Sequence, residues 1–253
     1  MRQMIKRLFR AAPSSFREAL LRQSVAAAEE EAKFRSGQPT MWGSLRNLAR
    51  HFRPGGIVDV GANVGDWSRA TSAIFPGIPM HLIEAQALLE PALREIGHPY
   101  TIALLGPENR RSVPFFLSGT GSSPLEEVTS FDKAKIELPM QRLDDIELVA
   151  ALPGPLLLKL DVQGFELEVL RGSKTTLERT EVILSEVSLL PYNVGAPLMH
   201  EVIAWLADRD FLPYDICGGL RRCSDMALFQ IDMIFVRSGS DLRAKRKFWP
   251  DEP

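Results

Sequence analysis

The residues whose types and spacing could do chemistry begin in the stretch IVDVGANVGDW, residues 57–67. Apolar residues lead into Asp59, and a turn that contains Gly61, Asn63 and Gly65 then precedes a helix-like segment. This pattern is typical of a buried parallel strand that turns sharply into a helix beneath a nucleotide-like cofactor. Glycine is expected in such a turn because a Cβ would keep the backbone away from the ligand. The stretch therefore predicts a cofactor site.

The turn differs from the dinucleotide-binding pattern, which would place glycines where Asn63 and Ser68 stand. In dehydrogenases those glycines allow a helix N-terminus to reach a pyrophosphate. The turn found here suits a ligand without phosphates, and S-adenosylmethionine is such a ligand. We expect Asp59 to lie beside the amino-acid end of that cofactor.

Glu84 ends the next apolar run, at about the 20-residue distance from the glycines where an acid binds a ribose. A carboxylate at this point accepts hydrogen bonds from both ribose hydroxyls and repels a 2′-phosphate. The alternative is an ordinary surface acid after a strand. The position therefore favours a cofactor whose ribose carries free hydroxyls.

A third group lies in LLLKLDVQGFELEVLRGS, residues 156–173. A nearly continuous apolar strand is expected to bring Lys159 and Asp161 to its carboxyl end, and Gly164 allows a tight turn into a helix. Open α/β sheets bind ligands outside the carboxyl ends of their strands, so Asp161 should lie near the reacting methyl. Two alternatives are that Asp161 only caps the following helix and that Lys159 pairs with an acid.

Glu186 ends the next strand, in SEVS, and is expected beside Asp161 across the sheet. Two mechanisms are compatible with this pair. One carboxylate acts as a general base on an acceptor hydroxyl, or both hold a divalent metal ion that lowers the pKa of that hydroxyl. Tyr192 and Asn193 follow on a loop, where they contact the acceptor or pack the loop. His200 is a further candidate base, against the alternative of a structural residue on its helix.

From residue 55 the chain alternates short apolar runs with segments of helical period. Strands separated in this way are typical of βαβ units and a mainly parallel sheet. The last two runs are joined by CGGLRRCSDMAL, which has no helical period, so we expect an antiparallel C-terminal hairpin at the sheet edge. This is the outline of a Rossmann-like class I methyltransferase fold with a mostly parallel seven-stranded sheet. The expected strands are 57–60, 79–84, 99–104, 155–161, 181–187, 212–217 and 230–236, and the expected helices are 66–75, 86–96, 165–178 and 197–208.

The segment 106–140 interrupts this alternation with a candidate hairpin, SVPFFLS, and a loop of small residues, SGTGSSP. Long insertions in compact domains are often lids or substrate loops. We therefore expect acceptor specificity to depend on this segment and on the loop 188–197.

Three regions are expected: an N-terminal helical extension at 1–50, a methyltransferase domain at 51–240 and a C-terminal tail at 241–253. Residues 1–10 place apolar side chains on one helical face and basic side chains around them. Such a helix either docks on the domain with its basic face solvated or makes a peripheral contact with an anionic membrane.

The composition is that of an ordinary globular protein, with 253 residues, 45% hydrophobic residues, 25% charged residues and a net charge of −2. This charge argues against a general nucleic-acid binder, and no apolar run approaches the ~20 residues that span a bilayer. Cys217 and Cys223 fit no zinc or redox spacing and indicate a reducing compartment. We therefore expect a cytoplasmic protein.

Taken together, these motifs resemble the FkbM family of S-adenosylmethionine-dependent methyltransferases. The resemblance rests on VDVGANVG, Glu84, QRLDDI, LKLDVQGFELEVLRGS, SEVS and QIDMIFVR, which span roughly residues 55–237. It implies O-methylation of a hydroxyl on a glycan, a lipid or a secondary metabolite. It also implies a cofactor site lined by Asp59, Gly61, Asn63, Gly65 and Glu84, with Asp161 at the active centre. SGTGSSPL, residues 118–125, resembles a serine-rich segment of the family.

The chain departs from the family pattern at Gln163, where the family commonly has Asp-Val-Glu-Gly. An amide cannot act as a base, so Gln163 keeps open the alternative of a non-catalytic protein that binds S-adenosylmethionine. A nicotinamide oxidoreductase is disfavoured by the glycine spacing and the terminal hairpin. Methylation of a nucleic-acid base is disfavoured because Asp-Val-Gln-Gly stands where an Asn-Pro-Pro-Tyr-like motif is usual.

Overall fold

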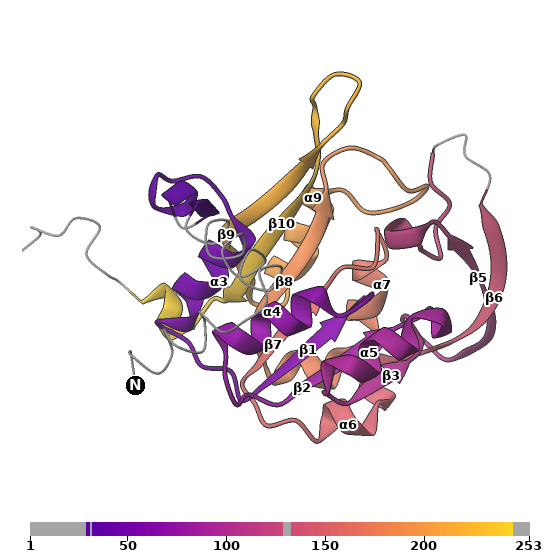
Figure 1. Ribbon diagram of the computed structural model, residues 1–253, viewed down its shortest axis with the longest axis horizontal. Helices are drawn as coiled ribbons and strands as arrows, with labels where there is room; N and C mark the ends of the chain where they lie inside the picture. The colour runs from indigo at the N-terminus through magenta and orange to yellow at the C-terminus, as the bar shows by residue number, and fades with distance from the viewer. Residues whose placement is uncertain (1–28, 31, 129–132, 245–253) are drawn as a thin grey trace, which may run out of the picture.

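The computed structural model describes residues 29–30, 32–128 and 133–244 (Figure 1). The expected basic helix at 1–10 and the C-terminal tail beyond residue 244 lie outside these residues. The chain is described from a short helical segment before Pro39 onward, and α3, Met41–Ala49, lies within the region expected as a helical extension. Thr40 caps α3 by accepting a hydrogen bond from the Gly43 amide.

A seven-stranded sheet forms the centre of the molecule, in the order β3-β2-β1-β7-β8-β10-β9. Neighbouring strands are parallel except on either side of β10, which runs antiparallel to β8 and to β9. The prediction of a mostly parallel sheet with a C-terminal antiparallel hairpin is therefore confirmed. The strands are β1 Gly56–Val60, β2 Met80–Glu84, β3 Tyr100–Ile102, β7 Leu156–Leu160, β8 Thr180–Ser188, β9 Phe211–Arg221 and β10 Leu228–Arg237.

Helices cover both faces of this sheet (Figure 1). On one face, α3 packs over Ile57 and Leu157, together with α4 (Asp66–Ile74) and α5 (Glu90–Ile96). On the other face, four helices pack over Val58 and Leu158: α6 Glu147–Ala150, α7 Glu166–Arg171, α8 Lys174–Glu178 and α9 Met199–Ala207. Because both faces are covered, β1, β2 and β7 are buried along their whole length.

The helix predicted at 165–178 is wrong, because two helices, α7 and α8, stand there. Gly172 separates them at a point where a Cβ would lie 2.1 Å from the carbonyl oxygen of Gly106. The new helix α8 is capped from a distance by Asp144, whose carboxylate accepts hydrogen bonds from the amides of Thr175 and Thr176 at 2.9 Å. The break is therefore a tertiary effect.

The insertion after β3 forms a second, smaller sheet in the order β4-β6-β5. The hairpin expected in SVPFFLS is not found, because this stretch forms most of a single strand: β5 (Arg110–Leu117) pairs antiparallel with the later strand β6 (Ala134–Gln141). The strand predicted at 99–104 divides, and its end becomes β4 (Leu104–Leu105) of this second sheet. Figure 1 shows the small sheet at the side of the domain, away from α3.

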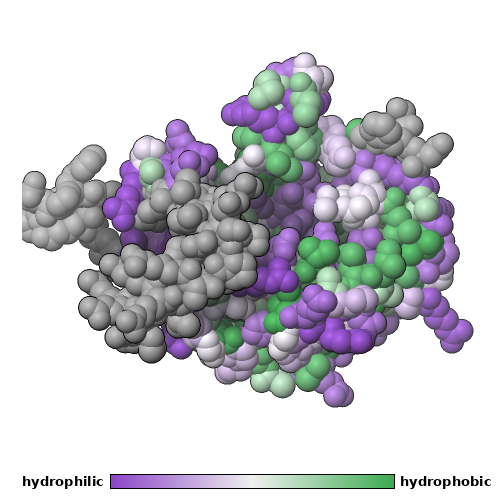
Figure 2. Space-filling model, in the orientation of Figure 1, coloured by the Kyte–Doolittle hydropathy of each residue, from purple (hydrophilic) through white to green (hydrophobic). Residues whose placement is uncertain are grey.

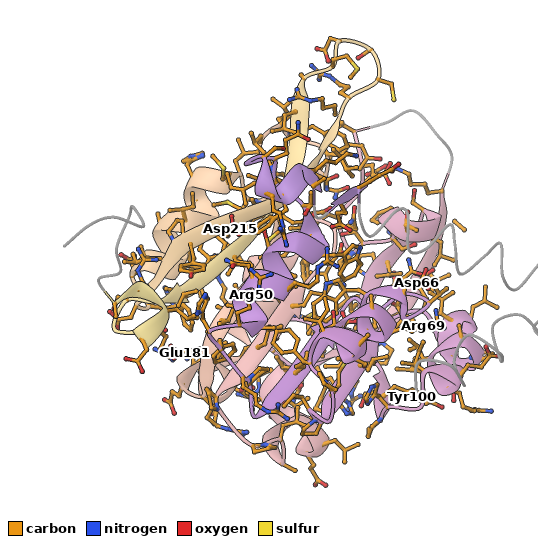
Figure 3. The ribbon with its side chains drawn as sticks, turned by 60° about the vertical axis from the view of Figure 1, so that its left-hand side comes forward. Arg50, Asp66, Arg69, Tyr100, Glu181 and Asp215 are labelled. Atoms are coloured by element: carbon orange, nitrogen blue, oxygen red, sulfur yellow. The ribbon has the colours of Figure 1, made fainter. Side chains whose placement is uncertain are left out.

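Charged side chains lie on the outer surfaces of these layers. On α4, Asp66 and Arg69 form an exposed ion pair of 2.9 Å, and Figure 3 shows both on the outside of the molecule. In Figure 2, hydrophilic side chains line a hollow near the centre of the view, and apolar side chains gather to its right. Within the part of the chain that the structure describes, no helix is long and apolar enough to cross a membrane.

Candidate active site

The turn after β1 lies against the turn after β7. Gly61 has a φ of 76°, which favours glycine, and a Cβ on it would lie 1.9 Å from the carbonyl oxygen of Asp161. Gly65 has a φ of 81°, and its Cβ would lie 2.5 Å from Ile96. The packing of the chain therefore gives a reason for glycine at both positions, and the expected approach of a ligand to this turn stays a prediction.

Glu84 fastens the end of β2 to this turn. One carboxylate oxygen accepts a hydrogen bond from the Asn63 amide at 2.9 Å, and the other accepts one from the Gln86 amide at 2.9 Å. The oxygen bonded to Asn63 retains a second lone pair, whereas the other also accepts a longer hydrogen bond of 3.4 Å from the side-chain amide of Gln86. Glu84 lines a pocket, where this carboxylate can accept a hydrogen bond from a ligand hydroxyl.

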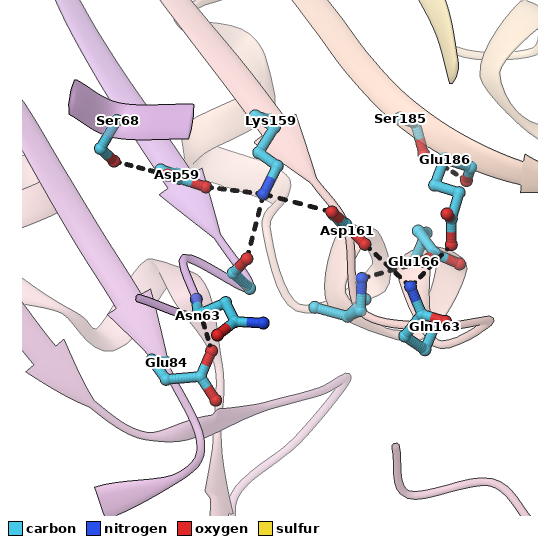
Figure 4. A network of polar contacts seen from close by, with 12 residues as sticks. Asp59, Asn63, Ser68, Glu84, Lys159, Asp161, Gln163, Glu166, Ser185 and Glu186 are labelled. Carbon is cyan, nitrogen blue, oxygen red and sulfur yellow. Dashed lines mark hydrogen bonds and ion pairs between the residues drawn. The ribbon is translucent and has the colours of Figure 1, made fainter. Parts of the chain in front are cut away.

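Lys159 lies behind the turn, at the centre of a chain of charges (Figure 4). Its ammonium is 3.0 Å from Asp59, 3.5 Å from Asp161 and 3.0 Å from the carbonyl oxygen of Gly61. Burial alone would lower the pKa of Lys159, but the two carboxylates outweigh burial and raise it above its usual value. The sequence alternative that Lys159 pairs with an acid is therefore confirmed.

Asp59 is fully buried and does not line the pocket. Its second oxygen accepts a hydrogen bond of 2.5 Å from Ser68, so both of its oxygens are occupied by the protein. Lys159 and Ser68 therefore enclose Asp59. That Asp59 lies beside the amino-acid end of the cofactor stays a prediction.

Asp161 and Glu186 come together at the carboxyl ends of β7 and β8, and Gln163 joins them. The side-chain amide of Gln163 donates hydrogen bonds to Asp161 at 3.0 Å and to Glu186 at 2.9 Å (Figure 4). Gln230 on β10 donates a further hydrogen bond to Glu186 at 2.8 Å. Burial, followed by the charge of Asp161, raises the pKa of Glu186 well above its ordinary value. This environment favours the neutral form of Glu186.

Glu166 holds the turn between β7 and α7. Its carboxylate accepts hydrogen bonds from the amides of Val162 at 3.0 Å and Gly164 at 3.2 Å. Burial raises its pKa to about 7. The alternative that Asp161 caps the helix is not supported, because Glu166 bonds the amides of this turn.

A pocket of about 480 Å³ opens at this edge of the sheet, a volume in the usual range for cofactor sites. Gly61, Asn63, Glu84 and Asp161 line it, whereas Asp59 and Gly65 do not. A second pocket of about 220 Å³ adjoins it. Both pockets are lined by Asp161, Glu186, Leu220 and Gln230.

The geometry of Asp161 and Glu186 does not fit the predicted divalent metal site. The amide nitrogen of Gln163 bridges the two carboxylates, in the position that a shared cation would need. Among the described residues, no group of three or more His, Cys, Asp or Glu side chains is arranged to hold a metal ion.

A protein-family model, the methyltransferase FkbM domain, matches residues 59–213, which is more than half of the chain. The chain belongs to the FkbM family of methyltransferases. The resemblance inferred from the motifs is therefore confirmed. A search of curated proteins finds no match.

Solved structures similar to this FkbM-family chain include methyltransferases of low sequence identity. Precorrin-6y C5,15-methyltransferase from Geobacter metallireducens GS-15 is 12% identical, with a TM-score of 0.42 over 78% of this chain and 86% of that chain. Ribosomal protein L11 methylase from Lactobacillus delbrueckii subsp. bulgaricus is also 12% identical, with a TM-score of 0.39 over 78% and 77%. TrmK of M. capricolum, solved with S-adenosylhomocysteine, is 7% identical, with a TM-score of 0.41 over 77% and 67%.

The two loop residues named in the sequence analysis, Tyr192 and Asn193, lie at this FkbM-family site. Tyr192 lines the larger pocket, and its hydroxyl donates to Glu127 at 3.0 Å. Asn193 is buried and donates to the backbone carbonyl of Gln163 at 2.6 Å. His200 is exposed on α9 and lines neither pocket of the site, so its alternative reading as a structural helix residue is favoured over that of a base.

Sequence reasoning missed Gln230, Ser123 and Glu166 as parts of this FkbM-family site. Gln230 lies within the motif QIDMIFVR, but its side chain reaches Glu186 only because β10 pairs antiparallel with β8. Ser123 lies in the small-residue loop and donates to the Gln163 carbonyl at 2.9 Å. Glu166 follows the Gly164 turn by two residues, and that spacing is the one local signal that could have identified it.

Proposed function

We propose that this S-adenosylmethionine-dependent methyltransferase acts on a hydroxyl of a small-molecule, glycan or lipid acceptor. The proposal rests on the position of Asp161, whose carboxylate lines both pockets. The larger of these pockets is also lined by Glu84, the expected ribose ligand. S-adenosylmethionine supplies a methyl group already activated by its sulfonium. The protein then has to align the acceptor oxygen with that methyl group and take up the hydroxyl proton.

Asp161 is the proposed proton acceptor, and Glu186 is its neutral partner. The Asp161 side chain is 40% exposed, so an acceptor can reach it. Glu186 is a weaker candidate base because its raised pKa favours the form that already carries a proton. Glu84, Asn63 and Gly61 are proposed to hold the ribose and the amino-acid side of the cofactor.

Cofactor choice is tested first by thermal unfolding. S-adenosylhomocysteine at a hundred times its dissociation constant should stabilise the protein by about 2.7 kcal/mol, and NAD should not stabilise it. Glu84→Gln should weaken S-adenosylhomocysteine binding, since one of the two acceptor oxygens becomes a donor. Stabilisation by NAD alone would favour the oxidoreductase alternative.

Methyl transfer is tested with a radiolabelled methyl group and a panel of sugar, lipid and polyketide alcohols. Asp161→Asn should lower the rate by about 10²- to 10⁴-fold and leave S-adenosylhomocysteine binding largely intact. Glu186→Gln should have a smaller effect, because it replaces a neutral carboxyl group with a neutral amide. Full activity of Asp161→Asn would disprove the assignment of the base, and cofactor binding without turnover of any alcohol would favour a non-catalytic protein.

A further inference from the structure

Gln163 is held in an unusual backbone conformation. Its φ is 55°, in the left-handed region that residues with a Cβ rarely adopt. Such a conformation persists where the surrounding structure holds it in place. The contacts of Gln163 therefore indicate what its conformation is for.

Two side chains hold the backbone carbonyl of Gln163. Ser123 donates a hydrogen bond to it at 2.9 Å, and Asn193 donates another at 2.6 Å. Each of these two residues is only 1% exposed. A Cβ on the next residue, Gly164, would lie 2.7 Å from the side chain of Ala196, so the loop after β8 packs directly on this turn.

Ser123 and Asn193 belong to two segments that meet beside the larger pocket. The segment 118–128 and the segment 188–196, together called the roof, are joined by a β-bridge between Glu127 and Asn193. Val128 donates its amide to Tyr192 at 2.9 Å, and Val194 donates its amide to Glu126 at 2.7 Å. Backbone hydrogen bonds therefore join the two segments into one connected unit.

Gln163 is hydrogen-bonded both to the roof and to the two carboxylates. The carbonyl of Gln163 is bound to the roof, and its side-chain amide is bound to Asp161 and Glu186. A displacement of the roof removes the hydrogen bonds that stabilise the left-handed backbone of Gln163. The amide would then no longer be held between the carboxylates.

We infer that Ser123 and Asn193 are positioning residues that couple the seating of the roof to the arrangement of Asp161 and Glu186 through Gln163. This inference rests on the proposed function for its catalytic consequence, but the coupling itself is independent of it. Gln163, where the family commonly has an acid, is then a bridging donor between the roof and the two carboxylates. Roof residues such as Ser122 and Tyr192 also line the larger pocket, so an acceptor that contacts them would stabilise the arrangement of Asp161 and Glu186 that the structure shows.

The coupling is tested without any acceptor by the side-chain amide signal of Gln163 in a ¹⁵N–¹H NMR spectrum, assigned by its loss in Gln163→Ala. In the wild-type protein this signal should shift with pH as Glu186, whose pKa is raised by burial and by the charge of Asp161, changes protonation. Ser123→Ala and Asn193→Ala should each abolish most of that shift, and Ser123→Thr, which keeps the hydroxyl, should restore it. Ser112→Ala and Asn109→Ala are matched controls outside the roof and the pockets.

The catalytic consequence is tested on the first alcohol found to be methylated. Ser123→Ala and Asn193→Ala should lower kcat by about 10- to 100-fold, as expected for small misplacements of reacting groups, with S-adenosylhomocysteine affinity within about twofold of wild type. An unchanged pH titration of the Gln163 amide in both variants would overturn the inference. If both variants lose the pH-dependent shift of the Gln163 amide signal but the wild type methylates no alcohol, the proposed function is overturned and the coupling is established.

Discussion

Lys159 is the residue on which the charge balance of the site depends most directly. It is buried between Asp59 and Asp161, and its ammonium is also 5.6 Å from the centre of the Trp67 ring. Removing one member of a buried ion pair leaves an uncompensated charge in a medium that solvates it poorly. The consequence can be measured as a loss of stability.

Lys159→Met should lower the free energy of unfolding by about 3–5 kcal/mol, as found when a buried pair loses one partner. The double variant Asp59→Asn with Lys159→Met should lose less free energy of unfolding, since it also removes one of the two carboxylate charges that Lys159→Met leaves unpaired. Urea unfolding followed by circular dichroism measures both, with Lys174→Met on the exposed start of α8 as the control. Equal stabilities of Lys159→Met and Lys174→Met would contradict the account.

Glu166 makes the stability of the protein depend on pH. Burial raises the pKa of Glu166 from 4.5 to about 7 in the folded protein. Between pH 4.5 and pH 7, the folded state therefore keeps a proton on Glu166 that the unfolded state has released. The stability contributed by the protonated carboxyl is full below pH 4.5 and is lost as the pH rises to about 7.

Glu166→Gln should remove this dependence, because the amide does not titrate over that range and retains an oxygen acceptor. Relative to the variant, the wild type should lose about 3 kcal/mol of stability from pH 4.5 to pH 7. Urea unfolding at several pH values measures the difference, and parallel profiles for the two proteins would show that Glu166 is not the group responsible. Asp232, whose pKa burial raises to about 6, contributes the same trend to both proteins.

Among the structural elements, the central strands were predictable because burial on both faces demands nearly continuous apolar runs. The acids that end β2, β7 and β8 were predictable because the carboxyl ends of parallel strands meet at one edge. The break between α7 and α8 was not predictable, because Asp144 caps α8 from about thirty residues earlier in the chain. The bridging role of Gln163 also depends on partners from distant segments, and its sequence neighbours contain no signal for it.

The junction between β1 and β7 offers a sharp test of packing against backbone strain. Gly61 and Gly77 have φ values of 76° and 77°, but a Cβ on Gly77 would meet nothing within 4 Å, whereas one on Gly61 would meet the Asp161 carbonyl at 1.9 Å. Gly77→Ala should cost about 1–2 kcal/mol, the price of a positive φ. Gly61→Ala should cost roughly 3 kcal/mol or more and should weaken S-adenosylhomocysteine binding. Thermal unfolding of the two variants compares them, and equal losses would mean that the β1–β7 contact is unimportant.

On the scale of the whole molecule, the small sheet has an apolar cluster of its own, which meets the core of the central sheet at Leu105 and Phe165. The central sheet contributes to two large clusters, one on each face. The small sheet β4-β6-β5 has its own cluster, in which Leu104, Phe115 and Met140 are buried and Ala85 and Phe165 pack against them. A region with a small core of its own can open while the rest of the protein stays folded.

Phe115→Ala and Phe211→Ala should therefore have different effects, although each removes a phenyl ring that is at most 3% exposed. Phe211 belongs to the large cluster over the central sheet, so its loss should lower the protection of slowly exchanging amides throughout β1, β7 and β8. Phe115 belongs to the small cluster, so its loss should speed hydrogen exchange in β5 and β6 and leave the central strands protected. Native-state hydrogen exchange followed by mass spectrometry distinguishes the two patterns. Since Phe115 also lines the larger pocket, S-adenosylhomocysteine should slow exchange in β5 and β6 of the wild type. Uniformly faster exchange across both sheets in Phe115→Ala would show instead that the two sheets unfold as one unit.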